Sequence, residues 1–580
     1  MSVLSVPDAQ VRSLSTASLL LVLLLIAACG DDDPSDANGG PDANVIVECC
    51  GDGDGDLGDD DGHERDHEFG DGDGDGDGDG DGDGDGDGDG DDDDAGVDDD
   101  AGIDDDAGIA EVSTRANPFV LADHDPFDTF AADVDTASYD ALLRDLAGGR
   151  APVPALVRLE EYVNYFHYDY PTPEPTARDP FRIDLEAASA PMREDVHVLR
   201  VGIAAEALGA HNRRKANLVF LVDISGSMGS PDKLPMVQQT LTHALATLEP
   251  DDLISIVTYA GGASVLLSPT PVREHDTIAA AIEGLESGGS TAGSRGIQLA
   301  YEQARAAFLQ EGINHVLLCT DGDFNVGVTG TDELIALIEK ERESGVTLTA
   351  LGFGRSRLGE AMMERVSNAG NGTYSIIYEA RQAHRYAETR LISSLVHVAK
   401  DMKIQVEFNP EHVEAYRLLG YDNRRIADED FRDDLVDAGE VGAGHTVTAL
   451  FEVILVGDPV PDIVGAPAPR GGADYAGPRE VPADALARVK VRYKRVADAA
   501  DAQALEVSAD ISPDAFLPVV DVTADLRWAL GMALLGERLV DNAYSNTIDF
   551  DKLRAWLTPL ADVDADRRQL VDQLDRIEAL

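Results

Sequence analysis

Residues 218–222 read LVFLV, an uninterrupted apolar run followed at once by the polar sequence DISGS. A strand with no polar residue on either side is typical of the centre of a parallel sheet that helices cover on both faces. Downstream, apolar strands alternate with segments whose apolar residues recur at helical spacing. This alternation predicts an α/β fold over residues 211–400, a doubly wound and mostly parallel sheet of Rossmann-like type. The predicted helices are 233–248, 275–285, 292–309, 332–343, 359–368 and 380–398, and the further strands are 253–257, 315–319, 347–353 and 373–377.

Side chains with oxygen donors follow two of these strands. Asp223, Ser225 and Ser227 come directly after LVFLV, and Asp321 follows the strand HVLLC. Between them, Thr291 stands in a glycine-rich loop at the head of a helix. Because ligands bind beyond the carboxyl ends of parallel strands, we expect these side chains to meet at one edge of the sheet. Hydroxyl and carboxylate oxygens without Cys or His suit Mg²⁺, with Mn²⁺ or Ca²⁺ as alternatives, and argue against zinc.

The order of these residues closely resembles the metal-ion-dependent adhesion site of von Willebrand factor type A (VWFA) domains. The resemblance implies that Ser225, Ser227 and Thr291 bind the metal through their hydroxyls. It also implies that Asp223 and Asp321 hold the metal largely through water, and that one position stays open for a partner's carboxylate. The plainer interpretation is that Ser227 and Thr291 only cap helices, which leaves the two aspartates at strand ends unexplained.

The segments on both sides of the α/β region contain the motifs NPF (117–119), FAADVDTASY (130–139), EEYVNYF (160–166), KIQVEFNP (403–410), YRLLGY (416–421) and GAGHTVTAL (442–450). By these motifs the flanking segments resemble a bacterial subgroup of exported type A proteins. Residues 116–210 resemble its N-terminal extension domain, and residues 401–580 resemble its C-terminal domain. From the residues alone, 401–510 alternate apolar and polar side chains, which predicts an antiparallel β layer, and 520–580 show helical spacing. Trp528 and Trp556 fall on apolar helix faces and are expected in the core.

An apolar run lies close to the N-terminus and reads SLLLVLLLIAA at residues 18–28. The run is too short to span a hydrocarbon core of ~30 Å and has the length typical of a signal peptide. It leads into Cys29 in a sequence that resembles a bacterial lipobox, which implies a lipoprotein signal peptide over residues 1–29 with lipid on Cys29. The alternative is a plain secretory signal cleaved near residue 28. Because Gly30 follows the cysteine, we expect a cell-envelope protein anchored to the outer membrane without spanning it.

About half of the chain's acidic excess lies in one segment. The formal net charge of the 580 residues is −66, and residues 30–110 contain 35 acidic residues against one basic residue. Gly-Asp repeats with almost no large apolar side chains cannot offset the entropy of ordering, so residues 30–115 are predicted to be a disordered Asp/Gly-rich linker. A surface this acidic repels phosphate backbones, which excludes nucleic acid as a partner.

Catalytic motifs are missing from the sequence. It contains no phosphate loop, dinucleotide fingerprint, zinc-protease motif or nucleophile elbow. Cys319 and His445 are expected to be structural. We therefore predict a protein without enzymatic activity that binds a carboxylate-bearing protein partner through the metal, as an adhesion or assembly module of the envelope. Two alternatives stay open: a metal-dependent hydrolase, for which Asp323 is the one further acid near the site, and an envelope scaffold whose metal is purely structural.

Overall fold

The computed structural model describes residues 116–579 apart from short gaps at 133–134, 175–176, 194, 208–212, 291–292, 323–330, 357–358, 423, 437, 497 and 499–501. The predictions for residues 1–115, Cys29 and the acidic linker among them, lie outside the described residues. The same holds for Thr291 and Asp323. Within the described ranges, no helix combines the length and the apolar character that a membrane crossing needs.

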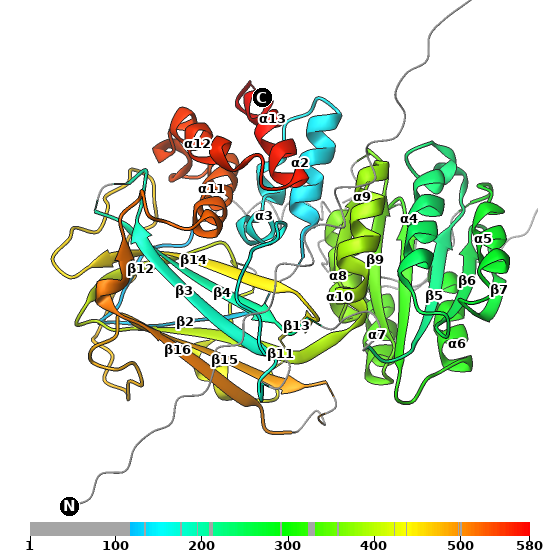
Figure 1. The fold of residues 1–580 in the computed structure, drawn as a ribbon, viewed down its shortest axis with the longest axis horizontal. Coiled ribbons are helices and arrows are strands. Elements are labelled where there is room, and N and C mark those ends of the chain that lie inside the picture. Colours follow the sequence, from blue (N-terminus) through cyan, green and yellow to red (C-terminus); the bar gives the residue numbers. More distant parts are fainter. Residues whose placement is uncertain are drawn as a thin grey trace, which may run out of the picture. The chain divides into compact units, whose positions relative to one another are not determined.

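The α/β segment forms the predicted doubly wound sheet, with strand order β10-β9-β8-β5-β6-β7 (Figure 1). The first apolar run becomes the central strand β5, in which all eight residues are buried. Neighbouring strands are parallel except at the edge, where β7 runs antiparallel to β6. The strand bounds are β5 Ala216–Asp223, β6 Leu253–Tyr259, β7 Ala263–Pro271, β8 Ile313–Thr320, β9 Thr347–Phe353 and β10 Tyr374–Ile377.

Helices cover both faces of this sheet, as the sequence predicted. Helices α4, α5, α9 and α10 pack their apolar side chains on one face, and α6, α7 and α8 pack on the other. This arrangement explains why β5 carries apolar residues on both sides. The helix bounds are α4 Leu234–Thr247, α5 His275–Glu283, α6 Gly293–Ala306, α7 Thr331–Glu343, α8 Glu360–Ala369, α9 Ala380–Arg385 and α10 Leu391–Leu395.

The structure differs from the predicted elements in two places. The prediction missed β7, whose residues alternate between half-buried and exposed positions and whose end carries Pro269 and Pro271, as expected of an edge strand. The predicted helix 380–398 is also too long, because Tyr386–Arg390 form a π-helical turn and the helix ends at Leu395. From His397 the chain is extended, since it pairs there with two neighbouring strands as β11.

Strands from both sides of the α/β segment build a sandwich of two β-sheets around one apolar core. β2 pairs with β11, and β4 pairs with β14, so the N-terminal extension and the C-terminal segment share both sheets. The predicted antiparallel layer over 401–510 is thus confirmed, while the predicted domain boundaries stay predictions. One sheet contains β1 Val120–Leu121, β12 Val413–Leu419, β14 Thr446–Leu455, β4 His197–Ala205, β3 Phe181–Ser189 and β17 Phe516–Leu517. The other contains β13 Gly439–Gly442, β11 His397–Phe408, β15 Ala487–Arg495, β16 Leu505–Ile511 and β2 Phe127–Ala131.

Helices also cover the outer face of the sheet that contains β14 (Figure 1). They form a second apolar core in which Trp528 is fully buried and Trp556 packs at the border. The indole N–H of Trp556 donates to the Arg527 carbonyl oxygen at 2.7 Å. Both tryptophans are therefore structural, as predicted. The helices are α2 Ala137–Ala147, α3 Leu159–Asn164, α11 Ala524–Leu539, α12 Phe550–Leu557 and α13 Ala565–Ala579.

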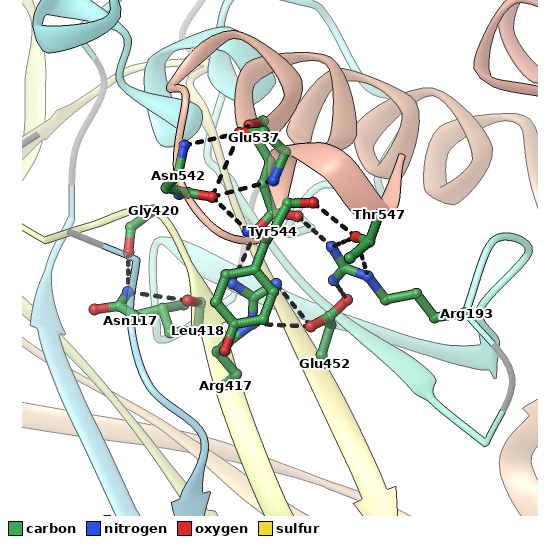
Figure 2. A network of polar contacts seen from close by, with 11 residues as sticks. Asn117, Arg193, Arg417, Leu418, Gly420, Glu452, Glu537, Asn542, Tyr544 and Thr547 are labelled. Carbon is green, nitrogen blue, oxygen red and sulfur yellow. Dashed lines mark hydrogen bonds and ion pairs between the residues drawn. The ribbon is translucent and has the colours of Figure 1, made fainter. Parts of the chain in front are cut away.

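A buried network of ion pairs joins α11 to this sheet (Figure 2). Arg417 on β12 donates to Glu537 on α11 at 2.8 Å and to Glu452 on β14 at 2.9 Å. Arg193, from the β3–β4 connection, donates to Glu537 at 2.8 Å and also pairs with Glu452. The ring of Tyr544 lies under the Arg417 guanidinium, with 3.7 Å between them. Two guanidinium groups and two carboxylates thus form four ion pairs away from water.

Candidate metal site

The first loop of the site begins at Asp223, the last residue of β5. Its carboxylate is fully buried, and both oxygens accept hydrogen bonds. The backbone N–H of Ser225 donates to Oδ1 at 2.8 Å, and the hydroxyl of Thr320, at the end of β8, donates to Oδ2 at 3.1 Å. The neighbouring parallel strands β5 and β8 therefore hold this carboxylate in one orientation.

The two serine hydroxyls that follow lie side by side. The Oγ atoms of Ser225 and Ser227 are 3.0 Å apart. Two adjacent oxygen ligands of an octahedral Mg²⁺, each at about 2.1 Å, would also lie about 3.0 Å apart. Ser225 is buried and Ser227 is exposed, so the pair lies at the border between the protein interior and solvent. A cation bound there would be held from the protein side and remain open to a partner.

The second carboxylate is that of Asp321, directly after β8 and 5% exposed. Its Oδ2 accepts a hydrogen bond at 2.8 Å from the ammonium of Lys233. The same ammonium donates to the backbone carbonyl oxygen of Ser227 at 3.0 Å. This ion pair links the loop after β8 to the loop after β5.

The third loop, which leads towards Thr291, is bonded to the first. The Gly226 N–H donates to the Gly289 carbonyl oxygen at 3.0 Å, and the Gly288 N–H donates to the Ile224 carbonyl oxygen at 2.7 Å. Gly289 has φ +92°, a backbone conformation that side-chain-bearing residues rarely adopt, which accounts for glycine at this position. The described chain thus reaches the site up to residue 290, and Thr291 itself lies outside the described residues.

The electrostatics at Asp223 favour a nearby positive charge. Burial raises the pKa of Asp223, hydrogen bonds from Ser225 lower it, and the charge of Asp321 raises it again, with a net upward shift. Tyr259 is the register partner of Asp223 across the neighbouring strands β5 and β6. Burial and the charge of Asp223 raise the pKa of Tyr259 well above its usual value. Two neighbouring carboxylates in a low-dielectric environment are stabilised by a cation.

The described residues fit a hard divalent cation. The structure brings together Asp223, Ser225, Ser227 and Asp321, which are four of the five predicted ligands. Among the described residues, no three His, Cys, Asp or Glu side chains are arranged to hold a metal ion. Hydroxyl and carboxylate oxygens are the donors that Mg²⁺ accepts.

Sequence reasoning missed three residues at the site. Thr320 bonds Asp223, Tyr259 lies beside it, and Lys233 pairs with Asp321. Thr320 could have been found, because it directly precedes Asp321 at the same strand end. Nothing in the sequence distinguishes Lys233 from an ordinary surface lysine at the start of a helix, and Tyr259 is the last residue of an apolar strand.

A relative in Escherichia coli (strain K12), the uncharacterized protein YfbK, is 37% identical to this chain over 445 residues, which cover 76% of both chains. This chain belongs to the YfbK family. A model of the C-terminal part of YfbK matches residues 393–580, and a von Willebrand factor model matches residues 112–200. The model of the von Willebrand factor type A domain matches residues 217–388 of this YfbK-family chain, which confirms the predicted domain.

More distant relatives match a smaller share of this chain. The uncharacterized protein sll0103 of Synechocystis sp. is 30% identical over 186 residues, which cover 32% of this chain and 43% of the relative. The inter-alpha-trypsin inhibitor heavy chain H4 of Bos taurus is 28% identical over 171 residues, which cover 28% of this chain and 18% of the relative.

Solved structures show weaker likeness. A von Willebrand factor type A protein from Catenulispora acidiphila covers 70% of this chain and 91% of its own, with 16% identity and a TM-score of 0.38. Proximal thread matrix protein 1 from the mussel byssus, solved with a zinc-occupied MIDAS motif, covers 33% of this chain and 46% of its own, with 18% identity and a TM-score of 0.26. Likenesses at these TM-scores carry no further conclusion.

Proposed function

We propose that this YfbK-family chain is a bacterial cell-envelope lipoprotein whose type A domain captures a protein partner through a bound divalent cation. The observation that carries this proposal is the fixed Asp223 carboxylate beside Asp321 and the hydroxyl pair of Ser225 and Ser227. Thr291 would supply the third hydroxyl. When bound, Mg²⁺ (or Mn²⁺ or Ca²⁺) would offer an open coordination position to a carboxylate of the partner.

The residues around the site favour binding over catalysis. Lys233, a basic side chain at the site, donates hydrogen bonds to Asp321 and to the backbone carbonyl oxygen of Ser227, so its nitrogen is already engaged with the loops of the site. A hydrolase would need a group free to take a proton from water. Type A domains are mostly interaction modules, and the model of this domain matches residues 217–388 of the chain.

The test is Mg²⁺-dependent capture with the mature chain in detergent. The immobilised chain is exposed to envelope extract in Mg²⁺ or in EDTA, and retained proteins are identified by mass spectrometry. We expect partners that bind in Mg²⁺, leave in EDTA and return when Mg²⁺ is restored. Thr291→Ala should reduce this capture at least about tenfold, because loss of one ligand weakens the cation's hold. Identical retention in EDTA and Mg²⁺ would contradict the proposal.

Membrane attachment is tested at the predicted lipidation residue. Cys29→Ser removes the thiol that would carry the lipid, and we expect the variant to move from the membrane pellet to the soluble fraction. Cys49→Ser is the matched control, because it removes a thiol from the acidic segment and should leave the chain in the pellet. Sucrose-gradient separation of the two membranes then tests the proposed outer-membrane location. If the Cys29 variant sediments with membranes in high salt, the chain has another anchor.

A further inference from the structure

Lys233 brings a positive charge to the proposed metal site. It is the residue directly before α4, and its ammonium donates to Asp321 Oδ2 at 2.8 Å and to the Ser227 carbonyl oxygen at 3.0 Å. The Lys233 side chain is 16% exposed and that of Asp321 is 2% exposed. An ion pair so far removed from water acts more strongly on a nearby charge than an exposed pair does.

The loop after β9 passes close to the aliphatic stem of this lysine. Gly354 has φ +113°, and a Cβ atom at this position would lie 3.1 Å from both Cγ and Cε of Lys233. The neighbouring Asp232 carboxylate accepts from the Arg355 N–H at 2.8 Å and from the Ser230 hydroxyl at 2.6 Å. Glycine at 354 therefore leaves room for the aliphatic stem, and the ammonium is directed to Asp321.

The charges of the site can be counted from its residues. Asp223 and Asp321 contribute two negative charges, and the hydroxyl ligands contribute none. With a divalent cation alone, these groups would sum to zero, and a neutral site attracts a carboxylate only weakly. Lys233 adds one positive charge and the neighbouring Asp232 carboxylate adds one negative charge, so all these groups sum to zero with Lys233 and to one negative charge without it.

We propose that Lys233 sets the charge of this site and thereby selects an anionic partner. By pairing with Asp321 it weakens the attraction of the site for the cation, and it keeps the loaded site from being negative and repelling a carboxylate. This inference rests on the proposed function, because it requires a cation at Asp223, Ser225 and Ser227. A lysine that only supported the loop would behave differently, since its loss would weaken the binding of the cation and the binding of the carboxylate together.

The experiment separates the two steps in the mature full-length chain. Lys233→Gln keeps a hydrogen-bond donor and removes the charge, Lys233→Met removes both, and Lys233→Arg keeps the charge. Lys340→Met, an exposed residue on α7, is the matched control for charge loss. Mg²⁺ affinity is measured by calorimetry. Carboxylate affinity is then measured by titrating the Mn²⁺-loaded chain with acetate. Acetate that displaces metal-bound water lowers the relaxation rate of the water protons, and this rate is the readout. Acetamide serves as the neutral probe.

We expect opposite changes in the two affinities. Lys233→Gln and Lys233→Met should bind Mg²⁺ about tenfold more tightly, because the lysine charge that repels the cation is gone. They should bind acetate about tenfold more weakly, because the same charge attracts the anion, and the affinity for acetamide should stay unchanged. Lys233→Arg and Lys340→Met should match the wild type. Circular dichroism in EDTA identifies any variant that fails to fold. If Lys233→Met fails to fold, the affinities of Lys233→Gln, which keeps a hydrogen-bond donor, test the inference.

Weaker Mg²⁺ binding by a folded Lys233→Gln variant, or unchanged acetate affinity, would overturn the inference while leaving the proposed function in place. A wild-type chain that binds neither Mg²⁺ nor Mn²⁺ would instead remove the proposed function, and the inference with it. The wild-type titration is made first, so the two failures are distinguished before any variant is compared.

Discussion

Replacing both Asp223 and Asp321 by asparagine is expected to lower the Mg²⁺ affinity of the chain at least about a thousandfold. Each carboxylate would lie within a few ångströms of the cation, where a unit charge contributes several kcal/mol at an effective dielectric constant of about 20. The double variant removes both charges and leaves the hydroxyl groups of Ser225 and Ser227 in place. Calorimetric titration with Mg²⁺ measures the loss directly.

The fold of this double variant should survive. The amide that replaces the Asp223 carboxylate keeps an oxygen for the Ser225 N–H, and its nitrogen can donate to the Thr320 hydroxyl oxygen. At position 321 the ion pair with Lys233 is lost, but the amide oxygen can still accept a hydrogen bond from the ammonium, which also keeps its bond to the Ser227 carbonyl oxygen. Burial raises the pKa of Asp223, so its charged form is disfavoured in the folded chain and a neutral amide removes that cost. In EDTA we expect a melting temperature equal to or above that of the wild type.

The control for the double variant is Asp276→Asn, a fully exposed position on α5. It removes one carboxylate from the same domain and should change neither Mg²⁺ affinity nor melting temperature. Saturable Mg²⁺ binding by the folded double variant, at wild-type affinity, would show that the cation binds elsewhere.

Glu537→Ala is expected to lower the free energy of unfolding by about 3–5 kcal/mol, because it leaves two buried guanidinium groups, Arg417 and Arg193, without one of their carboxylate partners. The Glu537 side chain is 2% exposed. Asp562→Ala breaks the exposed pair with Arg568 and should cost less than about 1 kcal/mol. Urea unfolding of both variants against the wild type measures the difference, and equal losses would contradict the assigned role of the network.

The same network gives stability a defined pH dependence. Burial alone would raise the pKa of Glu537, but the charges of Arg417 and Arg193 outweigh it, and the pKa falls below the ordinary value of 4.5. A carboxyl group with a lowered folded-state pKa stabilises the fold fully above 4.5, and this contribution is lost as the pH falls through the lowered value. Glu537→Gln should therefore show a flatter decline of stability below pH 4.5 than the wild type.

The sequence predicts the α/β sheet well because a strand buried on both faces consists of consecutive apolar residues, such as LVFLV in β5. It also places Asp223 and Asp321 together, since neighbouring parallel strands end at one edge. The sandwich could not be read in the same way, because its pairings join distant segments: the Gln405 amide, for instance, donates to the Thr129 hydroxyl across 276 positions of sequence. The Lys233–Asp321 pair is hidden for the same reason, since 88 positions separate the two residues.

Segments before and after the type A domain pair with each other in both sheets of the sandwich. The sandwich can therefore form only after the C-terminal segment is present. Strands β2, β3 and β4 precede the type A domain, and their partners β11 and β14 follow it. A chain delivered from its N-terminus therefore presents β4 with an open edge until β14 arrives, and open edges pair with other chains. The type A domain, whose sheet draws only on residues 216–377, can close in the meantime. A chain cut after that domain would keep its binding loops and expose unpaired strands to its neighbours.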